Sequence, residues 1–304
     1  MEFINPKTDY AFKKIFGSAQ SKDILISFLN ALVYDNTPTI ADLEILNPNL
    51  PPRVEGLKDT YLDVKAKLND GTLVIIEMQV LNVQSFGKRV LFNAAKTYAF
   101  QLKKSEGYRM LKPVIALTLT DFEMFPDREA FLARFVYREK NDGTAYPENE
   151  IELVFIELPK FTKDLDQLQT LTDKWIYFIK SARSLTEIPA TMEDDPELHH
   201  AFEIANQTNL TPEEREDLDR QEMFIHDQQG AVNLGIEQGR VQGLAQGLEQ
   251  GLEQGLEEGR VEGQQAAQCE IAQKLLNQLD DAAISATTGL SLAEVQQLRD
   301  AQAD

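Results

Sequence analysis

A short segment of the sequence concentrates residue types that can do chemistry. In TYLDVKAKLNDGTLVIIEMQV, residues 60–80, Asp63 and Glu77 carry carboxylates, and Gln79 follows two positions after Glu77. Glu77 stands in the apolar run LVIIEMQV, where burial of a charged carboxylate costs free energy unless a partner compensates it. The relative positions of these three side chains therefore decide what the segment can do.

Both halves of the segment are predicted to be β-strands, because they are rich in Val, Ile, Leu and Tyr and are separated by Asn69-Asp70-Gly71. A two-residue turn at Asp70-Gly71 would set Val64 against Glu77, an apolar side chain against a charged one. A three-residue loop with Gly71 in the left-handed conformation instead gives one apolar face. The pairs on that face are Leu62–Met78, Val64–Ile76 and Ala66–Val74. We predict this second register.

In this register Asp63 faces Glu77 directly, on the same face as Gln79. Like charges so placed cost roughly 0.2–1 kcal/mol, and a divalent cation between them would remove the repulsion. Carboxylate oxygens are the ligands that Mg²⁺ and Mn²⁺ prefer. The alternative is an exposed sheet face on which Lys65 and Lys67 neutralise the two acids. The geometry of the hairpin alone leaves both interpretations open.

Helices and other strands must hold this hairpin in place. Amphipathic spacing predicts helices that begin at Thr8 and Ser21 and helices over residues 86–104 and 163–185. A buried strand is predicted in KPVIALTLTDF, residues 112–122, and a second hairpin over residues 134–161. Trp175, Phe178 and Ile179 are the expected core anchors of the last helix. The order of elements predicts a mixed sheet flanked by helices, in the α/β or α+β class.

Charge is distributed unevenly along the chain. The net charge is −20, but residues 1–110 carry 14 Lys and Arg against 12 Asp and Glu, so the acidity belongs to the rest of the chain. A weakly basic N-terminal part is compatible with phosphate binding. The single Cys269 excludes a disulfide framework, and no apolar run is long enough for a membrane span or signal peptide. We therefore expect a cytoplasmic protein without membrane contact.

The C-terminal part contains a glycine repeat. Gly occurs at every fourth position from Gly235 to Gly263. A stripe with this spacing drifts about 40° around a helix per repeat, so it cannot form one straight seam. The repeat is either a solvated linker or marginal helix, or one partner of a close-packed helix pair in an oligomer. The residues after it predict a small helical unit in which Ser291 and Glu294 form a capping box, and we expect it to support dimerisation.

Four collinear blocks of the sequence resemble a known family. They are NPKTDYAFKKIFG, DILISFLNAL, LDVKAKLNDGTLVIIEMQV and LKPVIALTLTDFEMF. Together they resemble the recombination-promoting nuclease family, transposase-like members of the PD-(D/E)xK nuclease superfamily, over about residues 3–185. The resemblance implies an αβββαβ core like that of restriction endonucleases, with a helical C-terminal extension. The implied organisation is a nuclease-like domain over 1–185, an acidic helical segment over 186–234, the repeat over 235–263 and a helical unit over 264–304.

The resemblance also implies an activity and a site. The activity is hydrolysis of DNA phosphodiester bonds with Mg²⁺, or with Mn²⁺ or Ca²⁺, and without a small-molecule cofactor, in DNA recombination or mobile-element activity. Asp63 and Glu77 match the acidic motif residues, and they would hold the metal with the main-chain carbonyl of Met78. Asp9 matches an additional acid that some members carry. Gln79 stands where the wider superfamily has lysine.

The glutamine changes what the site is expected to do. Gln79 can hydrogen-bond a water or a phosphate but cannot offset charge, so activity should be lower than in relatives with lysine. Replacing Gln79 by Lys is therefore expected to raise the rate. Lys65, Arg89 and Lys96 are predicted to contact DNA phosphates. Two other functions remain open, a catalytically inactive DNA-binding adaptor with this fold and an oligomeric interaction protein whose repeat-bearing tail is the working part.

Overall fold

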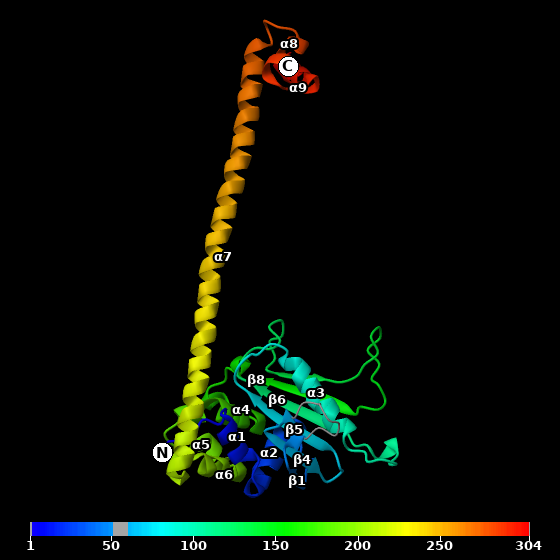
Figure 1. Cartoon of the computed structure of the whole chain (residues 1–304), viewed down its shortest axis with the longest axis vertical. Helices are drawn as coiled ribbons and strands as arrows, with labels where there is room; N and C mark the ends of the chain where they lie inside the picture. Colours follow the sequence, from blue (N-terminus) through cyan, green and yellow to red (C-terminus); the bar gives the residue numbers. More distant parts are fainter. Residues whose placement is uncertain (1, 51–59, 304) are drawn as a thin grey trace. The chain divides into compact units, whose positions relative to one another are not determined.

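A mixed β-sheet forms the centre of the first of two units, Met1–Gln229 and Gly230–Asp304, in a computed structural model that describes residues 2–50 and 60–303. The strand order is β1-β4-β5-β6-β8-β7, with β5, β6 and β8 parallel and the other pairs antiparallel. The strands are β1 (Leu43–Leu46), β4 (Val64–Leu68), β5 (Leu73–Gln79), β6 (Val114–Thr120), β7 (Leu132–Phe135) and β8 (Ile151–Glu157). A separate pair consists of β2 (Asn49–Leu50) and β3 (Thr60–Tyr61). The predicted mixed sheet is confirmed (Figure 1).

Helices cover both faces of this sheet (Figure 1). One face carries α3 (Phe86–Ala99), whose Val90 and Ala94 are buried in a cluster with Ile75 of β5. The other face carries α1 (Asp9–Phe16), α2 (Lys22–Leu32), α4 (Leu171–Ser181) and α6 (Pro196–Ala205). A short helix α5 (Ala190–Glu193) precedes α6.

The core between the sheet and α1, α2, α4 and α6 is rich in aromatic rings. Phe16 contacts Phe28 at 4.6 Å and Trp175 at 5.9 Å between ring centroids. The predicted anchors Trp175, Phe178 and Ile179 are all fully buried. Such rings bury a large apolar area and hold α1, which carries part of the site, against the sheet.

The hairpin of β4 and β5 has the predicted register. The aligned residues are Val64–Ile76, Lys65–Ile75, Ala66–Val74 and Lys67–Leu73. Gly71 has a φ of 93°, and its N–H donates to the carbonyl of Leu68. Since a φ of this sign favours glycine, the loop fixes the register that puts one apolar face toward the core.

The apolar face is interrupted where the sequence predicted that it would continue. Leu62 was expected beside Val64 on one face, but Leu62 is buried in the α3 cluster, and Val64 lies in the cluster on the opposite face. Strand β4 begins only at Val64, and the N–H of Leu62 donates to the carbonyl of Pro48. The alternation therefore breaks at Asp63, which stands in a bend outside the strand.

Several element boundaries differ from those predicted. The N-cap at Thr8 is confirmed, because its hydroxyl accepts a hydrogen bond from the N–H of Ala11. The helix predicted over 86–104 ends at Ala99, where the side chain of Gln101 bonds both main-chain groups of Lys112 instead. The helix predicted over 163–185 begins only at Leu171, after a capping box formed by Thr170 and Asp173.

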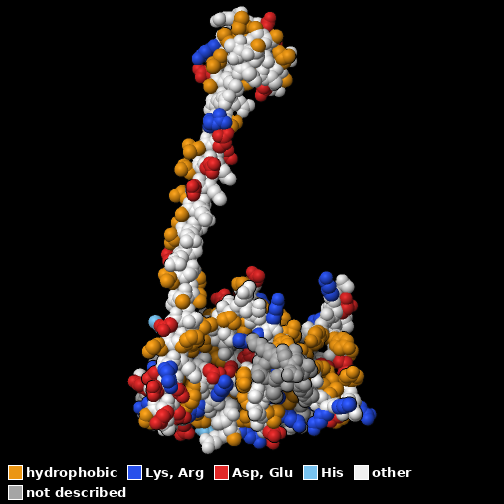
Figure 2. Space-filling view, viewed as in Figure 1, with side chains coloured by type: hydrophobic (Ala, Val, Ile, Leu, Met, Phe, Trp, Pro, Cys, Tyr) orange, Lys and Arg blue, Asp and Glu red, His pale blue; other side chains and the backbone are white. Residues whose placement is uncertain are grey.

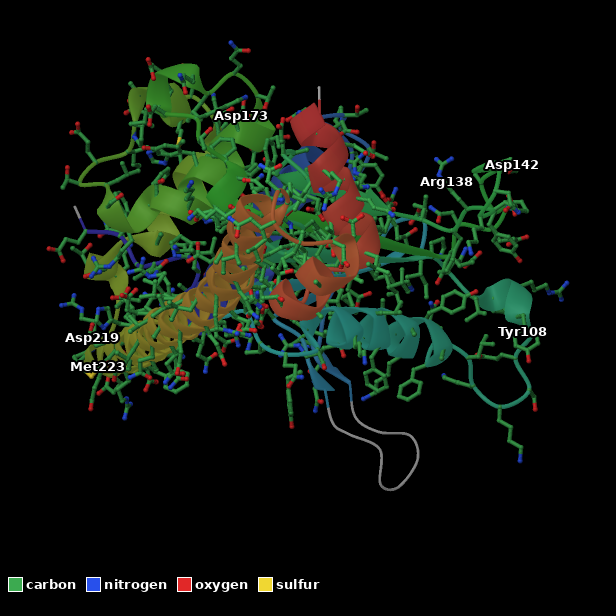
Figure 3. The ribbon with its side chains drawn as sticks, turned by 90° about the horizontal axis from the view of Figure 1, so that it is seen from above. Tyr108, Arg138, Asp142, Asp173, Asp219 and Met223 are labelled. Atoms are coloured by element: carbon green, nitrogen blue, oxygen red, sulfur yellow. The ribbon has the colours of Figure 1, made fainter. Side chains whose placement is uncertain are left out.

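The second hairpin is confirmed, with β7 aligned antiparallel to β8. Its strands are shorter than the predicted span, and a long connection joins them. Figure 3 shows Arg138 and Asp142 on this connection. The guanidinium of Arg138 donates to the carbonyl of Gly143, a residue with a φ of 74°.

The second unit is helical. Helix α7 (Pro212–Leu275) begins in the first unit and contains the whole glycine repeat, and it is followed by α8 (Asp281–Thr288) and α9 (Leu292–Ala303). A small core joins them, made by Ala272, Leu276, Ile284, Leu290 and Val295. The predicted capping box is confirmed, because the N–H of Ser291 donates to Glu294 at 2.7 Å and the N–H of Glu294 donates back at 3.3 Å.

The repeat exposes apolar side chains along α7 (Figure 2). Leu244, Leu248, Leu252 and Leu256 are each at least 64% exposed. Between them the interior glycines face open space, since an added Cβ at Gly247 or Gly251 meets nothing within 4 Å. No helix in the described part of the chain combines the length and apolar character that a membrane span requires.

Candidate active site

Asp63 lies beside the C-terminal end of β5, where that strand is no longer paired with β4. Its carboxylate accepts a hydrogen bond of 2.7 Å from the main-chain N–H of Met78. The side chain is 16% exposed, and its other oxygen lies 3.8 Å from Nζ of Lys13 on α1. The bend at Asp63 thus directs a carboxylate to the edge of β5.

A second acid on α1 adjoins Asp63. Nζ of Lys13 lies 2.6 Å from Oδ1 of Asp9 and 3.8 Å from Oδ1 of Asp63. Burial raises the pKa of Asp63 to about 7, the Met78 hydrogen bond opposes this rise, and the neighbouring Asp9 reinforces it. One lysine therefore compensates two adjacent carboxylates only in part.

Glu77 is held by α3. Its side chain is 10% exposed, Oε1 accepts a hydrogen bond from the Asn93 amide, and Oε2 lies 3.7 Å from Nη2 of Arg89. Burial raises the pKa of Glu77, against the lowering effects of Asn93 and Arg89. The Glu77 carboxylate can therefore lie within an apolar run, because an amide and a guanidinium from α3 contact it.

The two carboxylates do not face each other as a simple strand pair. Asp63 lies at the edge of β5, where it contacts Lys13 of α1 and the main chain of Met78, whereas the side chain of Glu77 contacts Asn93 and Arg89 of α3. The sequence predicted both on one face, and the break in alternation at Asp63 is the physical reason for the difference. The alternative of an exposed face neutralised by Lys65 and Lys67 also does not describe Glu77, which is buried and lies beside Arg89.

Gln79 links the end of β5 to α3. Its Nε2 donates to the carbonyl of Leu81 at 2.7 Å, and its Oε1 accepts a short hydrogen bond from Arg89. The side chain of Arg89 is 44% exposed, so one guanidinium contacts Gln79 and approaches Glu77 while it remains open to solvent. The position that lacks lysine therefore has an arginine next to it.

The main-chain carbonyl of Met78 points toward Asp63. The N–H of Met78 bonds Asp63, whereas the carbonyl of Gln79 accepts from Asp121 at the β6 side. Because the main-chain groups of one strand residue point to the same side and those of the next residue to the other, the Met78 carbonyl faces the Asp63 edge. The Met78 carbonyl and the Asp63 carboxylate therefore lie at the same edge of β5.

The donor chemistry suits a hard cation. Mg²⁺ is typically bound through one or two carboxylates and keeps waters or substrate phosphates as its other ligands. Within residues 2–50 and 60–303, no three His, Cys, Asp or Glu side chains are grouped so as to hold a metal ion, so Asp9 does not complete a three-acid site with Asp63 and Glu77. Asp63, Glu77 and the Met78 carbonyl are oxygen donors of the kind that a magnesium ion binds while it retains ligands from solvent or substrate.

The predicted basic residues differ in their access to DNA. Arg89 is exposed, and Lys65 on β4 is partly buried, which lowers the pKa of its ammonium group. Lys96 is only 5% exposed, and its Nζ lies 5.6 Å from the centroid of the Phe100 ring. A phosphate contact requires a side chain that reaches the surface. Arg89 and Lys65 meet this requirement, whereas Lys96 does not.

A cavity of about 470 Å³ adjoins the end of β5. On one side it is lined by Lys7, Asp9, Met78, Gln79, Val80 and Leu81, and on the other by Asp217, Arg220, Gln221, Phe224 and Ile225 from α7. Figure 3 labels Asp219 and Met223 in this same part of α7. The sequence did not indicate that the start of α7 would lie beside the site.

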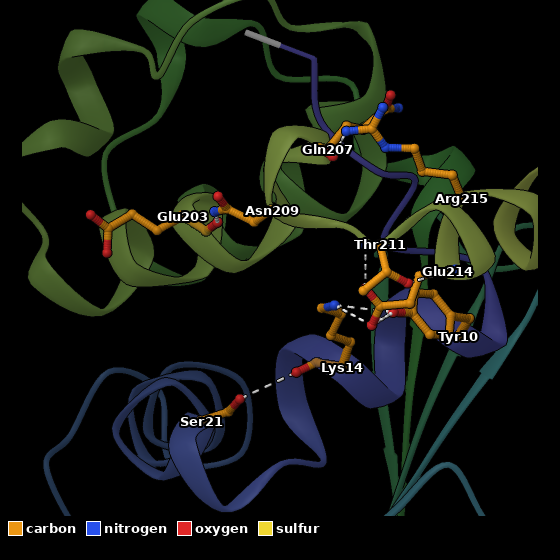
Figure 4. A network of polar contacts seen from close by, with 9 residues as sticks. All are labelled: Tyr10, Lys14, Ser21, Glu203, Gln207, Asn209, Thr211, Glu214 and Arg215. Atoms are coloured by element: carbon orange, nitrogen blue, oxygen red, sulfur yellow. Dashed lines mark hydrogen bonds and ion pairs between the residues drawn. The ribbon is translucent and has the colours of Figure 1, made fainter.

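Polar contacts fix the start of α7 against α1 (Figure 4). Glu214 binds Lys14 at 2.7 Å and also accepts from the hydroxyl of Tyr10, and these two contacts lower the pKa of Glu214 to about 2. The N–H of Tyr10 donates to Oε1 of Gln221 at 3.1 Å. Because α1 also carries Asp9 and Lys13, the same contacts position part of the site.

Asn93 and Lys13 are site residues that the sequence analysis missed. Arg89 and Asn93 are four positions apart on α3, and such a pair lies on one face of a helix. This spacing was a usable signal, but nothing local showed that the face points at β5.

The comparison with known proteins identifies the family of the chain. A family model described as PD-(D/E)XK nuclease family transposase matches residues 6–235, which is more than half of the chain. No curated protein and no solved structure matches the chain. The matched region contains the mixed sheet, both flanking helix layers, Asp63, Glu77 and Gln79. The chain belongs to the PD-(D/E)XK nuclease family transposases.

Proposed function

We propose that this protein is a metal-dependent DNA endonuclease that hydrolyses phosphodiester bonds and acts in DNA recombination or mobile-element activity. One observation carries the proposal. Glu77 is buried and Asp63 largely buried at the end of β5, both have raised pKa values, and they lie next to the Gln79–Arg89 pair. A protein gains no stability from two such carboxylates, and perturbed groups of this kind cluster at functional sites.

Asp63, Glu77 and the carbonyl of Met78 would hold the metal. When bound, Mg²⁺ supplies polarisation of the scissile phosphate and activates water for attack. Because the pKa of Asp63 is raised to about 7, part of its carboxyl group is protonated near neutral pH, so loading the site releases protons. The hydrogen bonds from Met78 and Asn93 orient the two carboxylates in advance.

The remaining residues act on the DNA. The water oxygen forms a bond to phosphorus while one ester P–O bond breaks, and the leaving oxygen takes up a proton. Arg89 and Lys65 are the proposed phosphate contacts, and Lys96 is left out because its side chain is buried. Arg220 and Lys7, which pair with Asp217 and Asp121, line the neighbouring cavity and are proposed to extend the phosphate-binding surface.

Plasmid nicking tests the proposal. Supercoiled DNA is incubated with purified protein in Mg²⁺, Mn²⁺ or EDTA, with the near-isosteric variants Asp63→Asn and Glu77→Gln. We expect metal-dependent nicking that both substitutions lower by at least 100-fold. Glu152→Gln is the matched control, since Glu152 is another partly buried strand carboxylate with a raised pKa that lies outside the site.

The result also separates the proposal from its rival. An inactive DNA-binding adaptor would retain DNA at low salt and would show no nicking in any metal. Equal activity in the wild type and both variants would indicate a contaminating nuclease and would contradict the proposed site.

Self-association through residues 230–304 is a second part of the proposal. The exposed leucines of the glycine repeat are the supporting observation, because α7 presents them without a partner among the described residues. Apolar stripes of this kind mark association surfaces, and glycines permit close approach of two helices. The proposed partner is a second copy of the same chain.

A further inference from the structure

The guanidinium of Arg89 is the positive group nearest to both Gln79 and Glu77 among the contacts of the described site. It donates a short hydrogen bond to Oε1 of Gln79 and lies 3.7 Å from Oε2 of Glu77. Gln79 is itself anchored, because its Nε2 donates to the carbonyl of Leu81. The amide of Gln79 is thus oriented with its oxygen toward Arg89.

The position of Arg89 is unfavourable for the helix that carries it. Arg89 follows Lys88 near the start of α3, which has no acidic residue in its first turn. A cation at a helix N-terminus opposes the helix dipole, at a cost of about 0.3–1 kcal/mol. The charge is compensated in part by Glu77 and by the Phe86 ring, whose centroid lies 5.0 Å from the guanidinium carbon. Helix stability therefore does not account for Arg89.

Among the described residues, the contacts of the Arg89 guanidinium leave donors for another ligand. Arg has five N–H donors in a planar fork that fits phosphate, and the contact with Gln79 uses one of them. Its side chain is 44% exposed, so an incoming phosphate can reach it. Gln79 can hydrogen-bond a phosphate but adds no charge, whereas Arg89 brings a fixed positive charge to the same place.

We propose that Arg89 supplies the positive charge beside the scissile phosphate that a lysine in place of Gln79 would supply, and that Gln79 is the positioning residue that orients its guanidinium. The inference rests on the proposed nuclease function. It assigns charge stabilisation in the transition state to a side chain of α3 and not to one of β5.

This assignment reverses the expected effect of Gln79→Lys. A lysine removes the oxygen that accepts from Arg89 and places a second cation beside the guanidinium. The single variant is therefore expected to be slower than the wild type, although it adds the residue found in the wider superfamily. The double variant Gln79→Lys/Arg89→Gln restores one cation and one amide with their positions exchanged, so it should recover activity.

Single-turnover nicking rates in saturating Mg²⁺ test the assignment. We expect Arg89→Gln to lower the rate by about 100-fold, in the range seen when one transition-state donor is removed. The double variant should be at least tenfold faster than Arg89→Gln. Lys88→Gln is the matched control, since it removes the same charge from the adjacent exposed residue of the same helix turn, and it should stay within threefold of the wild type.

A second readout does not depend on cleavage. DNA affinity is measured in EDTA over a range of salt concentrations, where loss of one phosphate contact lowers the slope of log affinity against log salt by about 1. Arg89→Gln should lower this slope, and the double variant should restore it. Far-UV circular dichroism and the thermal midpoint check that each variant is folded.

The outcomes distinguish this inference from the function on which it rests. Metal-dependent nicking that is equally fast in Arg89→Gln and Lys88→Gln would overturn the role of Arg89 and leave the nuclease intact. A faster Gln79→Lys variant, or a double variant no faster than Arg89→Gln, would also overturn it. Absence of nicking by the wild type in every metal would overturn both.

Discussion

The carboxylate of Asp63 accepts a 2.7 Å hydrogen bond from the main-chain N–H of Met78, in the place where a strand partner would otherwise bond β5. This contact ties a residue in a bend to the end of a strand. It orients the carboxylate toward the edge where the Met78 carbonyl also points. Asp63 is nevertheless largely buried next to Asp9, and both effects raise the pKa of its carboxyl group.

The stability of the metal-free protein should depend on the ionisation of Asp63. Its pKa is about 7 in the folded protein, against an ordinary value of 3.8, so the folded state binds more protons between these pH values. Stability from this group is therefore fully present below pH 4 and lost as the pH rises through 7. Each pKa unit is worth about 1.4 kcal/mol, so the expected loss is a few kcal/mol.

Urea unfolding of the wild type and Asp63→Asn at pH 5 and pH 8 measures this effect. The variant carries no charge at this position, so its advantage over the wild type should be larger at pH 8 than at pH 5. A difference that does not change with pH would mean that the Asp63 carboxylate is not destabilised by burial.

Binding of Mg²⁺ or Mn²⁺ should raise the thermal midpoint of the wild type by several degrees. A metal at 100 times its dissociation constant contributes about 2.7 kcal/mol, and it relieves the repulsion between Asp63 and Asp9. Asp63→Asn and Glu77→Gln should lose most of the shift, while Glu152→Gln should keep it. Differential scanning fluorimetry with and without EDTA measures this shift. Equal shifts in all four proteins would mean that the metal binds at a site other than Asp63 and Glu77.

Asn93→Leu should destabilise the protein and weaken its metal site. The Asn93 amide donates to Glu77, and without it the buried carboxylate loses its hydrogen-bond partner on α3. An unsatisfied group of this kind costs about 1–3 kcal/mol, and it favours the protonated form of Glu77. The free energy of unfolding should fall accordingly, and the metal concentration needed for the thermal shift at pH 7 should rise.

Thr97→Val is the matched control for Asn93→Leu. Thr97 lies one turn further along α3, is 2% exposed, and its hydroxyl has no hydrogen-bond partner within the described residues. Removal of that hydroxyl should leave stability within about 1 kcal/mol and metal affinity unchanged. If both variants weakened the metal site equally, packing of α3 would be the cause, and the Asn93–Glu77 contact would not.

Gly71→Ala should destabilise the hairpin that carries the site. Gly71 has a φ of 93°, and an added Cβ would lie 3.1 Å from a side-chain atom of Lys112. The left-handed conformation alone costs a non-glycine residue about 1–2 kcal/mol. Gly143→Ala tests the backbone effect alone, because Gly143 has a φ of 74° and an added Cβ meets nothing within 4 Å. Urea unfolding should show the larger loss for Gly71→Ala, and the reverse order would contradict the tight packing of this loop.

The double variant Leu248→Gln/Leu252→Gln should dissociate the proposed oligomer. These side chains are 74% and 64% exposed, and glutamine retains a good helix propensity while it removes the apolar surface. Light scattering coupled to size exclusion should show a lower mass for this variant than for the wild type. Met110→Gln, at a 60% exposed apolar residue of the first unit, should leave the mass unchanged. A monomeric wild type at all concentrations would contradict the proposal.

Much of the scaffold could be predicted from the sequence because it depends on local patterns. Period-two alternation and the glycine in the turn specified the register of β4 and β5, and the capping residues Thr8 and Ser291 marked the starts of α1 and α9. Helix ends were less predictable. Thr170 and Asp173 form their capping box well inside the segment that amphipathic spacing assigned to a helix.

The sequence by itself determined the types of the elements, the hairpin register and the identity of Asp63, Glu77 and Gln79 as the residues able to do chemistry. Only the tertiary structure decided which neighbours each of them has. Asp63 turns toward α1 because β4 begins one residue after it, and Glu77 and Gln79 meet Asn93 and Arg89 because α3 packs across the end of β5. Such contacts depend on how separate elements pack against one another, so no local pattern encodes them. Tyr10 and Gln221, which are 211 positions apart, are the plainest case.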